Sequence, residues 1–220
     1  MDAAAWDERY TAENLVWGSD PNRWVISELG ALTPTTALDL GSGEGRNAVW
    51  LASEGWSVTA IDFSSVAAER GKTLAAAAAE RTGRELDITW RVEDVSLAEV
   101  TQSAYDAVLV CYLQLPAYER RAAMRNAVHA LAPGGTLLVV AHDTTNLTEG
   151  YGGPQDPEVL YSAADVEEDL QDYLSSGSLV IERSGRVARE IETDDGTVIA
   201  WDLLVRMKGR DMHKGEVNFA

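Results

Sequence analysis

The sequence predicts an α/β fold in which seven strands form a doubly wound, mostly parallel sheet with an antiparallel C-terminal hairpin strand. Between residues 36 and 142, short apolar or β-branched runs alternate with helix-permissive segments, as in sheets that carry helices on both faces. Further on, two long extended runs flank Thr193-Asp194-Asp195-Gly196, and Asp-Gly between such runs favours a tight antiparallel turn.

The expected elements follow in chain order. The strands are residues 36–40, 57–61, 87–91, 107–111, 136–142, 179–191 and 197–207. Segments with good helix propensity separate them at residues 46–53, 64–81, 117–131 and 163–173. Pro133-Gly134-Gly135 is expected to separate the third helix from the fifth strand, because proline and glycine interrupt regular structure.

Composition limits the class of protein and its partners. The chain has 220 residues, 45% of them hydrophobic and 25% charged, which predicts one globular domain over residues 1–220. Its 36 acidic and 18 basic residues give a net charge of −18, which would repel nucleic acid and anionic membranes. One cysteine, Cys111, and an acidic N-terminus without a signal-like apolar run favour the cytoplasm. No stretch approaches the ~20 apolar residues of a membrane helix.

A glycine-rich turn joins the first predicted strand to the first helix. Glycine at Gly41, Gly43 and Gly45 would let the backbone approach a ligand closely. Arg46 occupies the place where the dinucleotide fingerprint G-x-G-x-x-G has its last glycine, which argues against a pyrophosphate. Asp62 ends the second strand and could accept hydrogen bonds from both hydroxyls of a ribose. These residues predict an adenosine-containing ligand.

Four motifs resemble those of a known family. The run Ala37-Leu38-Asp39-Leu40-Gly41-Ser42-Gly43-Glu44-Gly45-Arg46-Asn47 resembles the first motif of class I methyltransferases, which are Rossmann-like and use S-adenosyl-L-methionine (AdoMet). The similarity continues through Asp62-Phe63, Glu93-Asp94-Val95 and Leu131-Ala132-Pro133-Gly134-Gly135. The resemblance implies AdoMet as the cofactor and S-adenosyl-L-homocysteine as its product.

The resemblance also implies what individual residues do. Gly41 and Gly43 would contact the methionine portion of the cofactor, Asp62 the ribose, and Asp94 the adenine amino group. Asp39 would hold the loop or contact the methionine ammonium through water, and the main chain of Cys111 would accept a hydrogen bond from that ammonium. The cofactor-binding residues predicted in full are Trp6, Tyr10, Trp17, Asp39, Gly41, Ser42, Gly43, Arg46, Asn47, Asp62, Phe63, Asp94, Val95 and Cys111.

Within the superfamily, Gly45-Arg46-Asn47 and Trp6-Asp7-x-x-Tyr10 resemble the tellurite-resistance and thiopurine methyltransferase group. In that group an N-terminal aromatic segment covers the cofactor. The resemblance thus implies a helical cap at residues 1–35, a cofactor-binding core at 36–142, and a loop or lid, a helix and a hairpin at 143–220. Ile191-Glu192 stands where tellurite-resistance proteins carry His-Arg, which argues against tellurite chemistry itself.

Methyl transfer is an in-line displacement that needs no protein nucleophile, so the candidate catalytic residues are general bases. His142 and Asp143 follow the fifth strand and are the two candidates. Three scattered histidines and one cysteine show no metal-ligand spacing, so no metal is expected.

Three functions remain open for the chain, which is expected to be a monomer or homodimer. The first is methyl transfer to a small molecule at a soft sulfur, selenium or tellurium nucleophile. The second is methyl transfer to oxygen or nitrogen of a small metabolite with His142 or Asp143 as the base. The third belongs to another class, a non-catalytic AdoMet-binding sensor or interaction protein.

Overall fold

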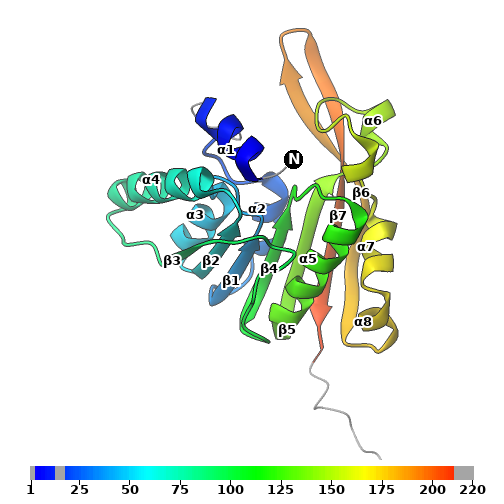
Figure 1. The fold of residues 1–220 in the computed structure, drawn as a ribbon, viewed down its shortest axis with the longest axis horizontal. Helices are drawn as coiled ribbons and strands as arrows, with labels where there is room; N and C mark the ends of the chain where they lie inside the picture. Colours follow the sequence, from blue (N-terminus) through cyan, green and yellow to red (C-terminus); the bar gives the residue numbers. More distant parts are fainter. Residues whose placement is uncertain (1–2, 13–17, 211–220) are drawn as a thin grey trace, which may run out of the picture.

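The computed structural model describes residues 3–12 and 18–210, and in them seven strands form one sheet (Figure 1). The strands are β1 (Thr36–Leu40), β2 (Ser57–Asp62), β3 (Ile88–Val92), β4 (Tyr105–Cys111), β5 (Leu131–His142), β6 (Leu179–Thr193) and β7 (Gly196–Gly209). Their order is β3-β2-β1-β4-β5-β7-β6, with β1 to β5 parallel and β7 antiparallel to both β5 and β6. The predicted sheet is confirmed.

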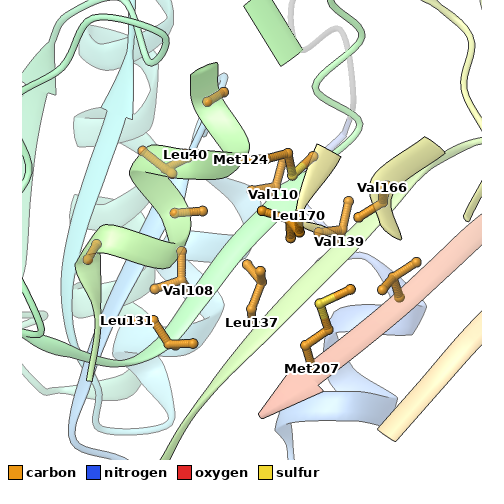
Figure 2. Packing of buried hydrophobic residues seen from close by; sticks show 14 of the residues in the cluster. Leu40, Val108, Val110, Met124, Leu131, Leu137, Val139, Val166, Leu170 and Met207 are labelled. Atoms are coloured by element: carbon orange, nitrogen blue, oxygen red, sulfur yellow. The ribbon is translucent and has the colours of Figure 1, made fainter. Parts of the chain in front are cut away.

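Helices cover both faces of the sheet. They are α1 (Ala3–Ala12), α2 (Arg23–Leu29), α3 (Arg46–Ser53), α4 (Ser65–Thr82), α5 (Ala117–Ala130), α6 (Asn146–Glu149), η1 (Pro157–Val159), α7 (Ala163–Asp169) and α8 (Gln171–Ser175). Because side chains alternate along a strand, neighbouring residues such as Val108 and Leu109 enter different apolar clusters. Figure 2 shows the cluster in which Met124 of α5 and Val166 of α7 meet Val108 of β4.

Two predicted boundaries were wrong. The helix expected at residues 163–173 is divided into α7 and α8 at Leu170, whose backbone leaves the helical region (φ −110°, ψ 12°) while its side chain is fully buried in the core. The fifth strand begins at Leu131, because Pro133-Gly134-Gly135 is accommodated by a register shift opposite Tyr105 and Ala107 instead of separating helix from strand.

The hairpin of β6 and β7 extends beyond the rest of the sheet (Figure 1, orange). β7 pairs with β5 as far as His142 opposite Asp202, whereas its pairing with β6 continues to Thr193 opposite Gly196. The projecting part therefore overhangs the edge at which β5 ends. Among the described helices, none is long and apolar enough to cross a membrane.

The indole of Trp90 on β3 occupies space that two glycines leave open. A Cβ built on Gly45, before α3, would lie 2.3 Å from the ring, and one built on Gly71 of α4 would lie 2.4 Å from it. The ring thus packs where the glycine turn, α4 and β3 meet.

Replacement of Gly71 by alanine is expected to destabilise the protein by about 1–3 kcal/mol, because overpacking against the Trp90 ring outweighs the gain in helix propensity. Chemical denaturation measures the effect, and Trp90→Phe should relieve part of it in the double variant. Ala77→Gly, at an exposed position of α4, reports helix propensity alone. A Gly71→Ala protein as stable as the wild type would contradict this packing.

Candidate active site

The turn between β1 and α3 has a backbone that glycine alone adopts readily. Gly41, Gly43 and Gly45 have φ angles of +77°, +54° and +75°. The backbone N–H groups of Gly41 and Ser42 donate to the Ile61 carbonyl at 2.8 and 3.0 Å, which ties the turn to β2. A Cβ on Gly41 would lie 2.9 Å from the Leu113 side chain. The turn is therefore a narrow backbone cradle at the carboxyl end of β1.

Asp62 closes this cradle from the end of β2. Its Oδ2 accepts a hydrogen bond from the Gly43 N–H at 2.8 Å, and its Oδ1 accepts one from the Ser64 N–H at 3.0 Å. Burial raises the pKa of Asp62, and these two hydrogen bonds lower it. Each carboxylate oxygen can accept more than one hydrogen bond, so the same carboxylate can also receive the two hydroxyls of a ribose.

Asp39 of β1 is a buried carboxylate. It is 1% exposed, and neither oxygen has a hydrogen-bond partner within residues 3–12 and 18–210. Burial, followed by the nearby Asp62, raises the pKa of Asp39 to about 7, while Arg46 and the Ala48 backbone lower it. A buried polar group of this kind calls for a partner, and a ligand ammonium would supply one. The site therefore fits the methionine ammonium of AdoMet.

Asp94 and Val95 follow β3, next to β2 in the sheet. Asp94 is exposed, and its Oδ1 accepts hydrogen bonds from the N–H and hydroxyl of Ser96 at 2.8 and 2.7 Å. Val95 is buried, and its carbonyl accepts a hydrogen bond from Asn126. Since β1, β2 and β3 are parallel neighbours, the structure brings Gly41, Asp62 and Asp94 to one edge of the sheet.

Helix α1 is attached close to this edge. Asp7 accepts hydrogen bonds from the Ser64 hydroxyl and from the Val66 N–H, directly after Asp62 and the half-buried Phe63. The rings of Trp6 and Tyr10 lie 5.4 Å apart on the same helix. The two predicted aromatic residues are thus held near the end of β2.

Four further residues were predicted to bind the cofactor: Asn47, Cys111, Arg46 and Trp17. Asn47 accepts a hydrogen bond from the Asn22 N–H at 2.9 Å, so this side chain holds the start of α2. Burial raises the pKa of Cys111 to about 12, which keeps the thiol protonated and unreactive. Arg46 begins α3 and lines a pocket. Trp17 lies outside the described residues.

This pocket lies next to the glycine turn and has a volume of about 630 Å³. Its walls are residues 18–23, residues 151–153, hairpin residues 189–191 and the side chains of Arg46, Tyr112 and His142. Gly153 lies so close to the His142 ring that a Cβ on it would be 3.0–3.1 Å from three ring atoms. The pocket is large enough for a small organic molecule.

The segment that carries residues 151–153 is fastened to the hairpin. Arg186 donates hydrogen bonds to Glu149 at 2.7 Å and to Thr145 at 2.9 Å, and its guanidinium stacks on the Trp201 ring at 4.0 Å. Asn146 accepts a hydrogen bond from the Trp201 N–H at 2.7 Å. These contacts hold the segment against β7.

A buried carboxylate, Asp202 of β7, organises the inner end of the pocket. Its Oδ2 accepts hydrogen bonds from Trp24 Nε1 at 3.0 Å, from the Tyr112 hydroxyl at 2.8 Å and from Arg189 Nε at 2.7 Å. Its Oδ1 lies 3.5 Å from His142 Nδ1. Sequence reasoning missed Asp202, although a carboxylate directly before the apolar run of residues 203–205 was a usable signal.

The two candidate bases have different surroundings. Burial lowers the pKa of His142 to about 4, although Asp202 raises it, and Arg189 lowers it further. His142 is therefore neutral near pH 7 and able to accept a proton. Asp143 is buried, and its Oδ1 accepts hydrogen bonds from the N–H and hydroxyl of Thr145, in the turn before α6. Of the two, the structure brings His142 to the pocket.

Known proteins resemble the chain in sequence and in fold. Residues 37–135 match the family model described as a methyltransferase domain. An uncharacterised methyltransferase of Mycobacterium tuberculosis is 32% identical over 126 residues, which cover 57% of this chain and 60% of that protein. The match therefore spans about three fifths of the length of this curated relative.

Two solved structures share the fold over nearly the whole chain. The N-methyltransferase NodS from Bradyrhizobium japonicum, in complex with S-adenosyl-L-homocysteine, has a TM-score of 0.67 at 21% identity and covers 95% of this chain and 98% of its own. A structure described for the conversion of a disulfide bond into a thioacetal group during echinomycin biosynthesis has a TM-score of 0.69 at 20% identity, with 94% and 92% covered. The sheet order, the glycine turn and these similarities together establish that the chain has the class I AdoMet-dependent methyltransferase fold.

Proposed function

We propose that this chain is an AdoMet-dependent methyltransferase that acts on a small molecule. The observation that carries the proposal is the contact between two sites: Arg46 belongs both to the glycine turn region and to the wall of the 630 Å³ pocket. A methyl donor in the first site would thus adjoin an acceptor in the second. A sensor without catalysis would need no such pocket.

The proposed cofactor contacts follow from the donors and acceptors at the edge of the sheet. Asp39 binds the methionine ammonium, Asp62 receives the ribose hydroxyls, and Asp94 accepts from the adenine amino group. Trp6 and Tyr10 lie beside these groups on α1. When bound, AdoMet supplies a methyl group on a positively charged sulfur, and the protein's task is to align the acceptor with it and exclude water.

His142 favours a protic acceptor, such as a hydroxyl or an amine. Its Nδ1 is enclosed and faces Asp202, while its ring lines the pocket, so Nε2 is the nitrogen available to an acceptor. A neutral imidazole there can remove the acceptor's proton as the methyl bond forms. Because the sequence resembles the tellurite-resistance and thiopurine methyltransferase group, a soft sulfur, selenium or tellurium nucleophile is the second candidate for the methyl acceptor. Such an acceptor needs no base.

Two measurements test the proposal. Calorimetry should detect AdoMet and S-adenosyl-L-homocysteine binding, and Asp62→Ala should weaken it by roughly tenfold or more, because hydrogen bonds to a charged group are lost. A screen of phenols, amines, thiols and metalloid oxyanions should then yield S-adenosyl-L-homocysteine with one class of acceptor. Absence of binding by the wild-type protein would refute the proposal, and binding without turnover would favour a sensor.

The group within the superfamily, the cytoplasmic location and the monomeric or homodimeric state stay predictions of the sequence.

A further inference from the structure

The inner end of the acceptor pocket is assembled from four separate parts of the chain around one carboxylate. Trp24 comes from α2, Tyr112 from the end of β4, His142 from the end of β5 and Arg189 from β6. All four side chains contact Asp202 of β7, which is fully buried. A single residue therefore fixes the mutual positions of three pocket-lining side chains, Tyr112, His142 and Arg189, and ties them to Trp24.

The two oxygens of Asp202 have unequal surroundings. Three donors converge on Oδ2: Trp24 Nε1, the Tyr112 hydroxyl and Arg189 Nε. Oδ1 lies 3.5 Å from His142 Nδ1, and it accepts a hydrogen bond from Arg189 Nη2 at 3.4 Å. Catalytic hydrogen bonds are often long before a substrate binds, and a small rotation of the ring would close this one. Of the two oxygens, Oδ1 is thus the one placed to accept a hydrogen bond from the Nδ1–H of the histidine.

We propose that Asp202 is the positioning residue of the methyl-transfer reaction, because it holds His142 in the tautomer with the proton on Nδ1 and the lone pair of Nε2 toward the acceptor. The inference rests on the proposed function. As the acceptor oxygen or nitrogen forms its bond to the methyl carbon, the sulfur keeps the electron pair of the broken carbon–sulfur bond. The acceptor's proton passes to Nε2, and the Asp202 carboxylate stabilises the resulting imidazolium.

Arg189 balances the charge of this arrangement. Its Nε donates a hydrogen bond to Oδ2 at 2.7 Å, so the buried carboxylate has a guanidinium as its partner. The Tyr112 hydroxyl also donates to Oδ2, and its ring lies 4.8 Å from the His142 ring, which limits rotation of the imidazole. Arg189 and Tyr112 thus hold the carboxylate and the orientation of the imidazole ring, and Asp202 determines which ring nitrogen carries the proton.

The tautomer can be measured in the wild-type protein. Nitrogen-15 NMR at pH 7 should show the His142 signal, identified by its loss in His142→Gln, with the proton on Nδ1 and none on Nε2. The opposite tautomer would overturn the proposal. This measurement needs neither an acceptor nor a change at Asp202, so it stands even if methyl transfer is never detected, which would count against the proposed function alone.

Asp202→Asn should reverse the tautomer. The amide oxygen is expected at the Oδ2 position, where three donors converge, so the amide NH₂ faces His142 Nδ1 and the imidazole proton moves to Nε2. We expect kcat to fall roughly 10²–10⁴-fold with unchanged AdoMet affinity. The double variant with His142→Gln should be no slower than His142→Gln alone, because the two residues act as a unit.

A matched control separates positioning from general stabilisation. Asp169 is also buried and pairs with two arginines, Arg120 at 2.7 Å and Arg121 at 3.1 Å, in the contact between α5 and α7. Asp169→Asn should lower the melting temperature without altering the His142 tautomer or kcat. Two results would show that Asp202 is merely structural. One is an Asp202→Asn protein in which His142 keeps the wild-type tautomer. The other is a double variant whose kcat lies below that of His142→Gln by the same factor that Asp202→Asn alone causes.

Discussion

Replacement of His142 by glutamine is expected to lower kcat roughly 10²–10⁴-fold for hydroxyl or amine acceptors, because the amide cannot take up the acceptor's proton. AdoMet affinity should stay unchanged, since His142 lines the acceptor pocket and lies outside the glycine turn. Steady-state kinetics with S-adenosyl-L-homocysteine as the readout, and calorimetry with AdoMet, measure the two effects. His129→Gln on α5 is the control.

The outcome also identifies the chemical class of the acceptor. An enzyme whose rate is insensitive to His142→Gln would be using a nucleophile that is already ionised, and the soft-nucleophile hypothesis would then replace the protic one. In the wild type, the groups facing His142 are Asp202, Arg189 and Tyr112, and its pKa is about 4. The rate should therefore be independent of His142 protonation above about pH 5.

The same pKa has a consequence for stability. The pKa of His142 is about 6.5 in the unfolded chain, the ordinary value for histidine, and about 4 in the folded protein. The free energy of unfolding therefore decreases by about 3 kcal/mol in total as the pH falls from 6.5 to 4. His142→Gln should show a flatter dependence of the unfolding free energy on pH in this interval.

Replacement of Asp39 by asparagine is expected to stabilise the ligand-free protein and to weaken AdoMet binding. The pKa of Asp39 is about 7 in the folded state against 3.8 unfolded, so ionisation of the buried carboxyl opposes folding increasingly as the pH rises between these values. The full cost is about 4 kcal/mol above pH 7, and the uncharged amide avoids it. Loss of the proposed contact with the methionine ammonium should lower affinity roughly 10–100-fold.

Urea denaturation from pH 4 to pH 8 measures the first effect, and the gain should be small at pH 4 and largest at pH 8. Calorimetry with AdoMet measures the second. Asp106→Asn is the control, because this exposed carboxylate lies at the opposite end of the neighbouring strand β4. An Asp39→Asn protein that is less stable at every pH and binds AdoMet normally would refute the role given to Asp39.

The local structure around the glycine turn and Asp62 was largely predictable because its contacts are short in sequence. Gly43 and Asp62 are 19 residues apart and belong to one strand–turn–helix–strand unit, whose pattern of apolar runs and glycines is visible in a single window. The strands and helices of this unit lie within one or two residues of their predicted positions. Local pattern and observed geometry agree there because the same backbone constraints determine both.

The acceptor pocket was not predictable in the same way. Arg189 lies on an extended run of the sequence, and nothing local links it to a carboxylate 13 residues away. Tyr112 and Trp24 lie 90 and 178 residues from the same carboxylate. Such contacts depend on strand register and on the order of strands in the sheet, which periodicity does not specify.

The position of Asp202 on the last strand has a consequence for the order of folding. Contacts of low sequence separation form early, whereas those between distant segments must await loop closure. As the chain is synthesised from its N-terminus, the Gly43–Asp62 contact can form once β2 has emerged. The hydrogen bonds of Trp24 and Tyr112 to Asp202 cannot form until β7 has been synthesised. A growing chain can therefore form the contact that shapes the proposed cofactor site well before it can form the carboxylate-centred contacts of the proposed acceptor pocket.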